Sequence, residues 1–145
     1  METKEKTIIT VETTVNAPVD QVWKLWTLPE HITQWNNASD DWHTPHAEND
    51  MQIGGGFLCR MEAKDGSFGF DFSGKYLEIK ENELIVYVID DGRKVHISFE
   101  AEGNATSIIE SFEAEGVNSL ELQKSGWQSI LDNFKKYAES KNLEV

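Results

Sequence analysis

The sequence predicts an α+β fold in which a curved antiparallel sheet of six or seven strands wraps around a long C-terminal helix. From residue 57 to about residue 113, stretches rich in β-branched and aromatic residues alternate with short turn sequences, a pattern typical of a β-meander. Nearer the C-terminus, apolar residues recur at helical spacing, which indicates one broad apolar helix face. Gly126 lies within this helix at a cost of about 1 kcal/mol relative to Ala, so we expect it to allow a close approach to the sheet. The residues of the apolar face are Leu120, Trp127, Ile130, Leu131, Phe134 and Ala138.

The N-terminal part of the chain predicts one strand followed by two short helices. Residues 7–15 alternate in β-forming side chains and are expected to form the first strand. Asn16 can cap the next helix, because its side-chain oxygen can accept a backbone N–H, and Pro18 is tolerated in a first turn. Pro29 then breaks this helix and begins a second one, which is expected to end near Trp35.

Three turn sequences set the expected register of the meander. Asp65-Gly66 and Asp91-Gly92 are strong signals for two-residue hairpins, and Gly103-Asn104 is a plausible third. Gly74 is expected to mark a bulge that brings Leu77 onto the inner face. The expected cross-strand pairs are Cys59–Phe72 and Arg60–Asp71 for the first turn, Val86–Ile97 and Val88–Val95 for the second, and Phe99–Ile108 and Ile97–Glu110 for the third.

The third register places Glu110 on the apolar, concave face of the sheet. A carboxylate in such a position is costly unless it is paired or protonated. One interpretation is a polar anchor, or an acid/base group, in a ligand chamber, with a raised pKa. The alternative is that a bulge turns the side chain outward or that a main-chain amide satisfies it.

A long helix that closes over a curved sheet can leave a chamber between the two, and this chamber is our functional hypothesis. A mostly apolar lining with one or two polar groups is the usual composition of a small-molecule site, so we expect one pocket of roughly a few hundred Å³. Trp35 and Trp42 are expected to close its mouth, and Glu110 to orient a ligand. Any single aromatic residue could instead fill the core. The candidate ligand-binding residues are Trp35, Trp42, Phe70, Phe72, Phe99, Glu110, Phe112, Trp127, Leu131 and Phe134.

A metal site is the second candidate. The loop-rich stretch 36–56, in which one short strand is expected around Trp42, contains His43 and His46 beside several acidic residues. These are acceptable ligand types for zinc or another divalent ion. However, Pro45 breaks any helix that would present both imidazoles on one face, and acidic loops are usually solvated. We therefore expect no metal and no other cofactor.

Nucleophilic and acid–base catalysis find little support in the sequence. Cys59 shares an apolar strand face with Met61 and has no cation nearby in sequence, so an inert core thiol is expected. His31 and His96 are isolated and are expected to be surface histidines rather than bases. The glycine run 54–56 lacks both the Lys-Ser/Thr pair and the following helix of a phosphate loop, and it indicates backbone bending instead. No residue is assigned a catalytic role.

Composition and charge limit the remaining possibilities. A chain of 145 residues fits one domain, expected to span residues 1–145 with a core over about 7–140. The net charge of −13 disfavours nucleic acids and anionic membranes, which would repel the protein. The single cysteine excludes an internal disulfide and fits a reducing compartment. A charged N-terminus, together with the lack of any apolar stretch near ~20 residues, predicts a cytoplasmic protein that does not cross a membrane.

The order of these elements and motifs resembles the START/birch-pollen-allergen superfamily (SRPBCC), which has the helix-grip fold. Within it, the chain is similar to the AHSA-like family, which is related to the C-terminal domain of the activator of the heat-shock-protein-90 ATPase. The resemblance extends over residues 7–140 and is specific for the fold and the family rather than for a ligand or reaction. The matching segments are residues 17–23, 29–35, 54–57, 74–79, 106–115 and 126–127.

The resemblance and the expected chamber lead to three classes of function. The first is non-enzymatic binding of a small apolar or amphipathic molecule between sheet and helix. The second is a stress-related or co-chaperone-like module that binds a chaperone or another protein. The third is an enzyme similar to the polyketide cyclases and dehydratases of the superfamily. The sequence leaves the ligand and the oligomeric state open.

Overall fold

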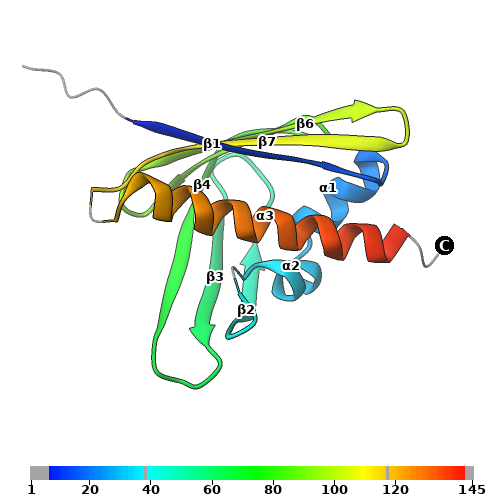
Figure 1. Cartoon of the computed structure of the whole chain (residues 1–145). Coiled ribbons are helices and arrows are strands. Elements are labelled where there is room, and N and C mark those ends of the chain that lie inside the picture. The colour runs from blue at the N-terminus through cyan, green and yellow to red at the C-terminus, as the bar shows by residue number, and fades with distance from the viewer. Residues whose placement is uncertain (1–6, 38, 117, 143–145) are drawn as a thin grey trace, which may run out of the picture.

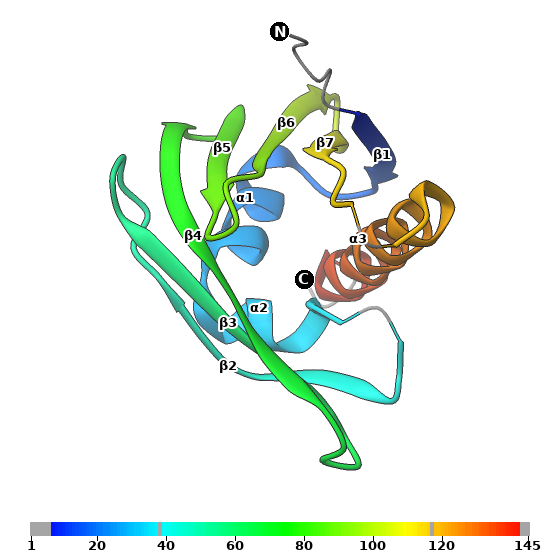
Figure 2. The ribbon, with the colours of Figure 1, turned by 90° about the vertical axis from the view of Figure 1, so that its left-hand side faces the viewer.

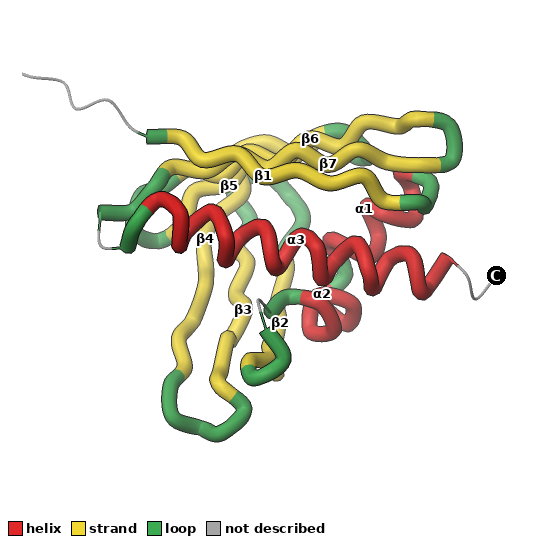
Figure 3. Tube along the Cα trace, viewed as in Figure 1, coloured by secondary structure: helices red, strands yellow, loops and turns green. Residues whose placement is uncertain are grey.

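The computed structural model describes residues 7–37, 39–116 and 118–142, and it confirms the α+β fold. The seven strands of this described part form one antiparallel sheet in the order β1-β7-β6-β5-β4-β3-β2 (Figures 1 and 3). The first and second strands lie at opposite edges, since α1 and α2 carry the chain from one edge to the other. The strands are β1 (Ile8–Val15), β2 (Trp42–Asn49), β3 (Gly56–Ala63), β4 (Gly69–Lys80), β5 (Leu84–Ile89), β6 (Lys94–Glu102) and β7 (Ala105–Glu113), and the helices are α1 (Val19–Thr27), α2 (Pro29–Trp35) and α3 (Leu120–Asn142).

The sheet is strongly curved, and the three helices lie on its concave side (Figure 2). Helix α3 runs along the open side of the curve and packs against β1, while α2 packs against β2 at the other edge. The two short helices also contact α3. The long helix therefore contacts β1 directly and is connected to the β2 edge through α2, and the curved sheet wraps around it as the sequence predicts.

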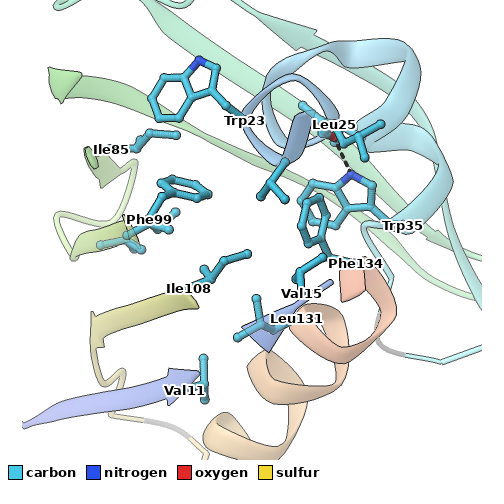
Figure 4. Packing of buried hydrophobic residues seen from close by; sticks show 14 of the residues in the cluster. Val11, Val15, Trp23, Leu25, Trp35, Ile85, Phe99, Ile108, Leu131 and Phe134 are labelled. Carbon is cyan, nitrogen blue, oxygen red and sulfur yellow. Dashed lines mark hydrogen bonds between the residues drawn. The ribbon is translucent and has the colours of Figure 1, made fainter. Parts of the chain in front are cut away.

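The densest part of the core lies beside the second half of α3 (Figure 4). Leu131 and Phe134 are fully buried there, near Val15 of β1 and Trp35 of α2. The ring of Phe134 meets that of Trp35 edge-on, with 4.9 Å between their centroids. The Trp35 indole N–H donates a hydrogen bond of 2.9 Å to the carbonyl of Leu25. Each large apolar side chain buried in this way stabilises the fold by about 1.5–3 kcal/mol, so this end is closed by solid packing.

Polar contacts fix the same half of α3 to the end of β1. The Lys135 ammonium donates to the carbonyl of Thr14 at 2.8 Å, and the carboxylate of Glu139 accepts a hydrogen bond of 2.9 Å from the backbone N–H of Asn16. The prediction that Asn16 caps α1 is wrong, because the N-cap is Pro18 and no side chain caps this helix. The N–H of Asn16 instead connects the chain between β1 and α1 to the long helix.

The registers expected from the first and third turns are confirmed. Cys59 pairs with Phe72 and Arg60 with Asp71, and the latter two side chains form an ion pair of 3.3 Å. In the third hairpin, Ile97 pairs with Glu110. Glu110 consequently lies on the concave face, as its parity predicts.

The register expected from the second turn is wrong by one residue. The loop contains three residues rather than two: Gly92 has a φ of 94°, and its N–H donates to the carbonyl of Ile89 at 2.8 Å. This glycine adopts the left-handed conformation that ends a three-residue hairpin loop and shifts the following strand. Tyr87 therefore faces Val95, and Ile85 faces Ile97. The inner face of β5 carries Ile85 and Tyr87 instead of the expected Val86 and Val88.

The bulge in β4 lies three residues later than expected. The pairing shifts between Tyr76 and Glu78, so Leu77 points outward and is 43% exposed, contrary to the prediction that it joins the inner face. Gly74 is required for a different reason. A Cβ at this position would lie 2.2 Å from the carbonyl oxygen of Val88 and close to the ring of Phe57, so no side chain fits between the strands here.

The reason expected for Gly126 is also wrong. Within the described part of the chain, nothing lies within 4 Å of the position that a Cβ would take on this residue. The helix backbone therefore does not approach the sheet closely at this point, and the glycine is not needed for packing.

These two glycines give a matched pair of substitutions. Gly74→Ala is expected to lower the free energy of unfolding by about 1–3 kcal/mol, because the strand must move to accept the methyl group. Gly126→Ala is expected to raise it by up to about 1 kcal/mol through helix propensity. Urea denaturation of both variants measures the effects. A Gly74→Ala protein as stable as the Gly126→Ala protein would contradict the close contact in β4.

Candidate functional site

A cavity of about 280 Å³ lies between the concave face of the sheet and the helices. It occupies the part of the interior beyond the solid packing around Phe134. Residues of β2, β3, β4, β5 and β7 form its sheet side, and all three helices or their ends contribute to the other side. Most of its wall is aromatic or aliphatic. Its lining consists of Trp26, Ile32, Trp35, Asn36, Glu48, Asn49, Phe57, Cys59, Met61, Phe70, Phe72, Tyr76, Ile85, Tyr87, Arg93, Glu110, Trp127 and Ile130.

The structure brings five of the ten candidate residues to this cavity. These are Trp35, Phe70, Phe72, Glu110 and Trp127. The indole of Trp127 lies flat on the ring of Phe112, with 3.9 Å between the centroids and 13° between the planes. This stacking holds the indole as a wall of the cavity and at the same time hides Phe112 behind it.

The other candidates do not line the cavity. Leu131 and Phe134 lie in the solid core, and Phe99 is covered by Trp23 and Trp26 at centroid distances of 5.3 Å and 5.7 Å. Phe112 is covered by Trp127, as described above. Trp42 lies outside, where its ring contacts Phe68 and Phe70. The periodicity of a helix or strand identifies its inner face. It does not reveal which residues of that face are covered by other side chains.

Several lining residues were not among the candidates. Tyr87 was missed because of the one-residue error in the β5–β6 register, and Tyr76 because the bulge was expected earlier in β4. Tyr76 donates a hydrogen bond of 2.5 Å to the side-chain oxygen of Asn49, whose amide donates to the carbonyl of Thr27 at 2.6 Å. A correct three-residue loop at Gly92 would have revealed Tyr87 from the sequence.

Glu110 is the most unusual group of the site. Its residue is only 6% exposed, and it lies between Val11 of β1 and Ile97 of β6 in the sheet. Among the described residues, no hydrogen bond or ion pair to its carboxyl group is found. Burial raises the pKa of Glu110 from 4.5 to about 8. The group is therefore mainly a neutral carboxylic acid at neutral pH and can donate a hydrogen bond into the cavity.

Three further groups of the cavity, Cys59, Tyr76 and Tyr87, are also held in their neutral forms. Burial raises the pKa of the Cys59 thiol to about 11, so this residue is a thiol rather than a thiolate nucleophile. The pKa of Tyr87 is raised well above its usual value, first by burial and then by the charge that Glu110 carries when ionised. Burial likewise raises the pKa of Tyr76.

The histidines that the sequence offers as metal ligands or as bases are not among the residues that line the cavity. In β2, His43 approaches Glu62 at 3.8 Å and His46 approaches Glu48 at 3.1 Å, and these are two separate pairs. In the part of the chain that the structure describes, no group of three or more potential ligands is placed to hold a metal ion. The expectation that His31 is an isolated surface residue is wrong, since its ring nitrogen hydrogen-bonds to the hydroxyl of Tyr137 at 2.6 Å.

A curved antiparallel sheet closed by a long helix around an apolar cavity defines the helix-grip class of proteins. The family model described as "Activator of Hsp90 ATPase homolog 1-like protein" matches residues 16–139. The chain therefore belongs to this AHSA1-like family, within the SRPBCC superfamily.

Solved structures agree with this assignment. An AHSA1-like protein from Aeromonas hydrophila is 41% identical over 94% of this chain and 95% of its own, with a TM-score of 0.88. A protein from Cytophaga hutchinsonii is 54% identical over 94% of each chain, with a TM-score of 0.79. A protein from Nitrosomonas europaea, at 17% identity and a TM-score of 0.80, shows the fold alone. Among curated proteins, none is similar enough to count as a match.

The family and fold show a ligand-binding or protein-interaction module in general terms. None of the helices in the described ranges is long and apolar enough to cross a membrane.

The buried carboxyl group makes the stability of the fold depend on pH. Between pH 4.5 and about 8, the native state holds the Glu110 proton while the unfolded state loses it, so raising the pH destabilises the protein. Glu110→Gln carries no ionisable proton at this position, so its stability lacks this pH dependence. Relative to the wild type, the variant is therefore expected to become more stable by roughly 3–5 kcal/mol as the pH rises across this window.

Urea denaturation across the pH range measures the difference, and Glu139→Gln is the control. The hydrogen bond from Lys135 lowers the pKa of Glu139, so this group is ionised in both states above pH 5 or so. Its variant should differ from the wild type by a constant amount in the same window. A pH-independent difference for Glu110→Gln would contradict the burial of its carboxyl group in an apolar wall.

Proposed function

We propose that the protein binds a small apolar or amphipathic molecule in the cavity between the sheet and α3. The observation that carries the proposal is the cavity of about 280 Å³ itself, with its aromatic and aliphatic wall and a single buried carboxyl group. Ligand sites usually combine such a wall with a few polar groups that fix orientation. The volume suits a molecule of about two or three fused or linked rings.

The wall is also held open by the protein's own packing. Trp127 is fixed by its stack on Phe112, and Phe72 contacts the same indole edge-on at 6.2 Å. On the sheet side, Phe57 rests against Tyr87 with a centroid distance of 4.8 Å. Rings that are supported by other rings do not need to reorganise on binding, which lowers the entropic cost of complex formation.

The neutral fluorescent probe N-phenyl-1-naphthylamine tests this proposal. Its fluorescence is expected to rise in a saturable, one-to-one manner with the wild-type protein. Ile130→Trp, which fills the cavity from α3, should weaken binding by at least about tenfold, because the probe and the indole compete for the same volume. Leu77→Trp adds the same side chain on the outer face of β4 and should bind like the wild type. Equal loss in both variants, or no saturable binding, would overturn the proposal.

Protein binding is the second candidate, and an exposed aromatic cluster favours it. In Figure 1 the β3–β4 hairpin projects beyond the rest of the sheet. At this hairpin, Phe68 is 61% exposed and Phe70 40% exposed, and the ring of Trp42 contacts both. Large aromatic residues clustered on a protrusion are common anchors at protein interfaces. The name of the matching family supports a heat-shock chaperone as the partner to test. A cyclase-like enzymatic activity stays a prediction from the family resemblance.

A pull-down with purified bacterial heat-shock-protein-90 chaperone tests the second candidate. If the cluster anchors the complex, Phe68→Ser should reduce the recovered chaperone by about fivefold or more, since an anchor side chain contributes over 1 kcal/mol. Ile8→Ser removes an equally exposed apolar side chain at the opposite edge of the sheet and should leave binding unchanged. Failure of the wild type to retain chaperone would exclude this partner.

A further inference from the structure

The polar groups within the cavity define one end of it. Glu110 of β7 and Tyr87 of β5 face the same concave side of the sheet, with β6 between them. Their partners on β6 are Ile97 for Glu110 and Val95 for Tyr87, which lie two residues apart on the same strand face. Both side chains line the cavity, and the charges of Arg93 and of an ionised Glu110 both act on the Tyr87 hydroxyl. In the described part of the chain, neither the Glu110 carboxyl nor the Tyr87 hydroxyl makes a hydrogen bond with another residue.

Most of the remaining charged and titratable groups around the cavity have partners of their own, and Arg93 is the cation whose charge also acts on Tyr87. Glu48 of β2 pairs with His46, and Arg93, which precedes β6, binds Asp91 through its Nε at 2.8 Å. Tyr76 of β4 is bound to Asn49, and Cys59 of β3 is a neutral thiol. The lining residues from α1, α2 and α3 are not titratable, and β1 presents Val11 opposite Glu110.

Building on the proposed function, we infer that the ligand is a lipophilic molecule with one neutral hydrogen-bond acceptor, such as a carbonyl oxygen, which receives hydrogen bonds from the Glu110 carboxyl and the Tyr87 hydroxyl. Both groups can donate, and both lack an acceptor in the protein. Both groups line the cavity, and among the described residues no fully buried side-chain polar atom lacks a partner, so the molecule that fills the cavity can supply the acceptor for each.

Positively or negatively charged ligands fit this end of the cavity less well than a neutral one. An amine would have to bring a cation into an apolar wall that also carries Arg93, and burying an ion pair costs desolvation of both charges. A carboxylate would be buried next to a carboxyl group that becomes an anion when it loses its proton, within a protein of net charge −13. A carbonyl oxygen requires no buried charge at all.

A pair of ligands that differ only in the acceptor tests the inference. 2-Acetylnaphthalene and 2-ethylnaphthalene have nearly the same shape, and each can be titrated by displacement of N-phenyl-1-naphthylamine. At about pH 6, the wild type should bind the ketone roughly tenfold more tightly than the hydrocarbon, as expected for buried hydrogen bonds. At about pH 9.5 this preference should fall to roughly threefold or less, because the carboxyl group has lost its proton and accepts instead of donating, and only the Tyr87 hydroxyl still donates.

Three variants separate the contributions of the two donors. Glu110→Leu should keep only the roughly threefold preference that the Tyr87 hydroxyl provides, whereas Glu110→Gln keeps a donor and should retain a larger preference for the ketone that no longer changes with pH. Tyr87→Phe removes only the hydroxyl and should lower the preference about threefold. Circular dichroism establishes that each variant is folded before titration.

The outcomes distinguish this inference from the function on which it rests. Equal binding of ketone and hydrocarbon by the wild type would overturn the acceptor inference and leave ligand binding intact. Failure of both to displace the probe, or failure of the probe to bind, would count against the proposed function itself. Tighter binding of 2-(aminomethyl)naphthalene than of the ketone would overturn the inference in favour of a cationic ligand.

Discussion

The structure depends on the packing of one half of α3 into the curve of the sheet. Leu131 and Phe134 are completely buried, and Lys135 and Asn133 bind main-chain carbonyls of β1 and α2 at 2.8 Å each. These contacts fix the helix at one end of the curve. The sheet opens away from this end, so the first half of the helix reaches the opposite strands only through Trp127, which stacks on Phe112 and meets Phe72 edge-on. The cavity is a geometric consequence of a straight helix held inside a curved sheet.

Glu110 is the place where this fold departs most from the rules of stability. The two residues that pair with Glu110 across the sheet, Val11 and Ile97, are both aliphatic. An aliphatic residue in place of Glu110 would therefore line the cavity wall at no electrostatic cost. Violations of this kind tend to occur where a protein needs a polar group for function rather than for folding. The carboxyl group therefore provides a chemical argument for ligand binding that the shape of the cavity alone does not.

The family indicates the general type of function, whereas the residues of the cavity wall bear on the kind of ligand. Membership of the AHSA1-like family indicates a module for binding ligands or proteins, and the fold is shared by a solved structure that is only 17% identical. At such identities the backbone is kept while the side chains that line the cavity can change. Under the proposed function, the inner wall of this particular chain, with its aromatic rings and its buried carboxyl, would distinguish one ligand from another.

The sequence by itself determined the fold class, the order of elements, and the inward position of Glu110, because turn residues and alternation set local geometry that long-range contacts do not alter. It predicted Trp35, Phe70, Phe72 and Trp127 on inner faces for the same reason. The register of β5 against β6 depends on whether the loop at Gly92 has two or three residues, and its left-handed backbone gives three, which moves Tyr87 inward. The tertiary structure alone decided which inner residues are covered. Leu131, Phe134 and Phe99 have the right parity for a pocket, yet packing between distant segments fills their end of the chamber, and Trp127 covers Phe112. No local pattern encodes such contacts, because they join residues far apart in the sequence.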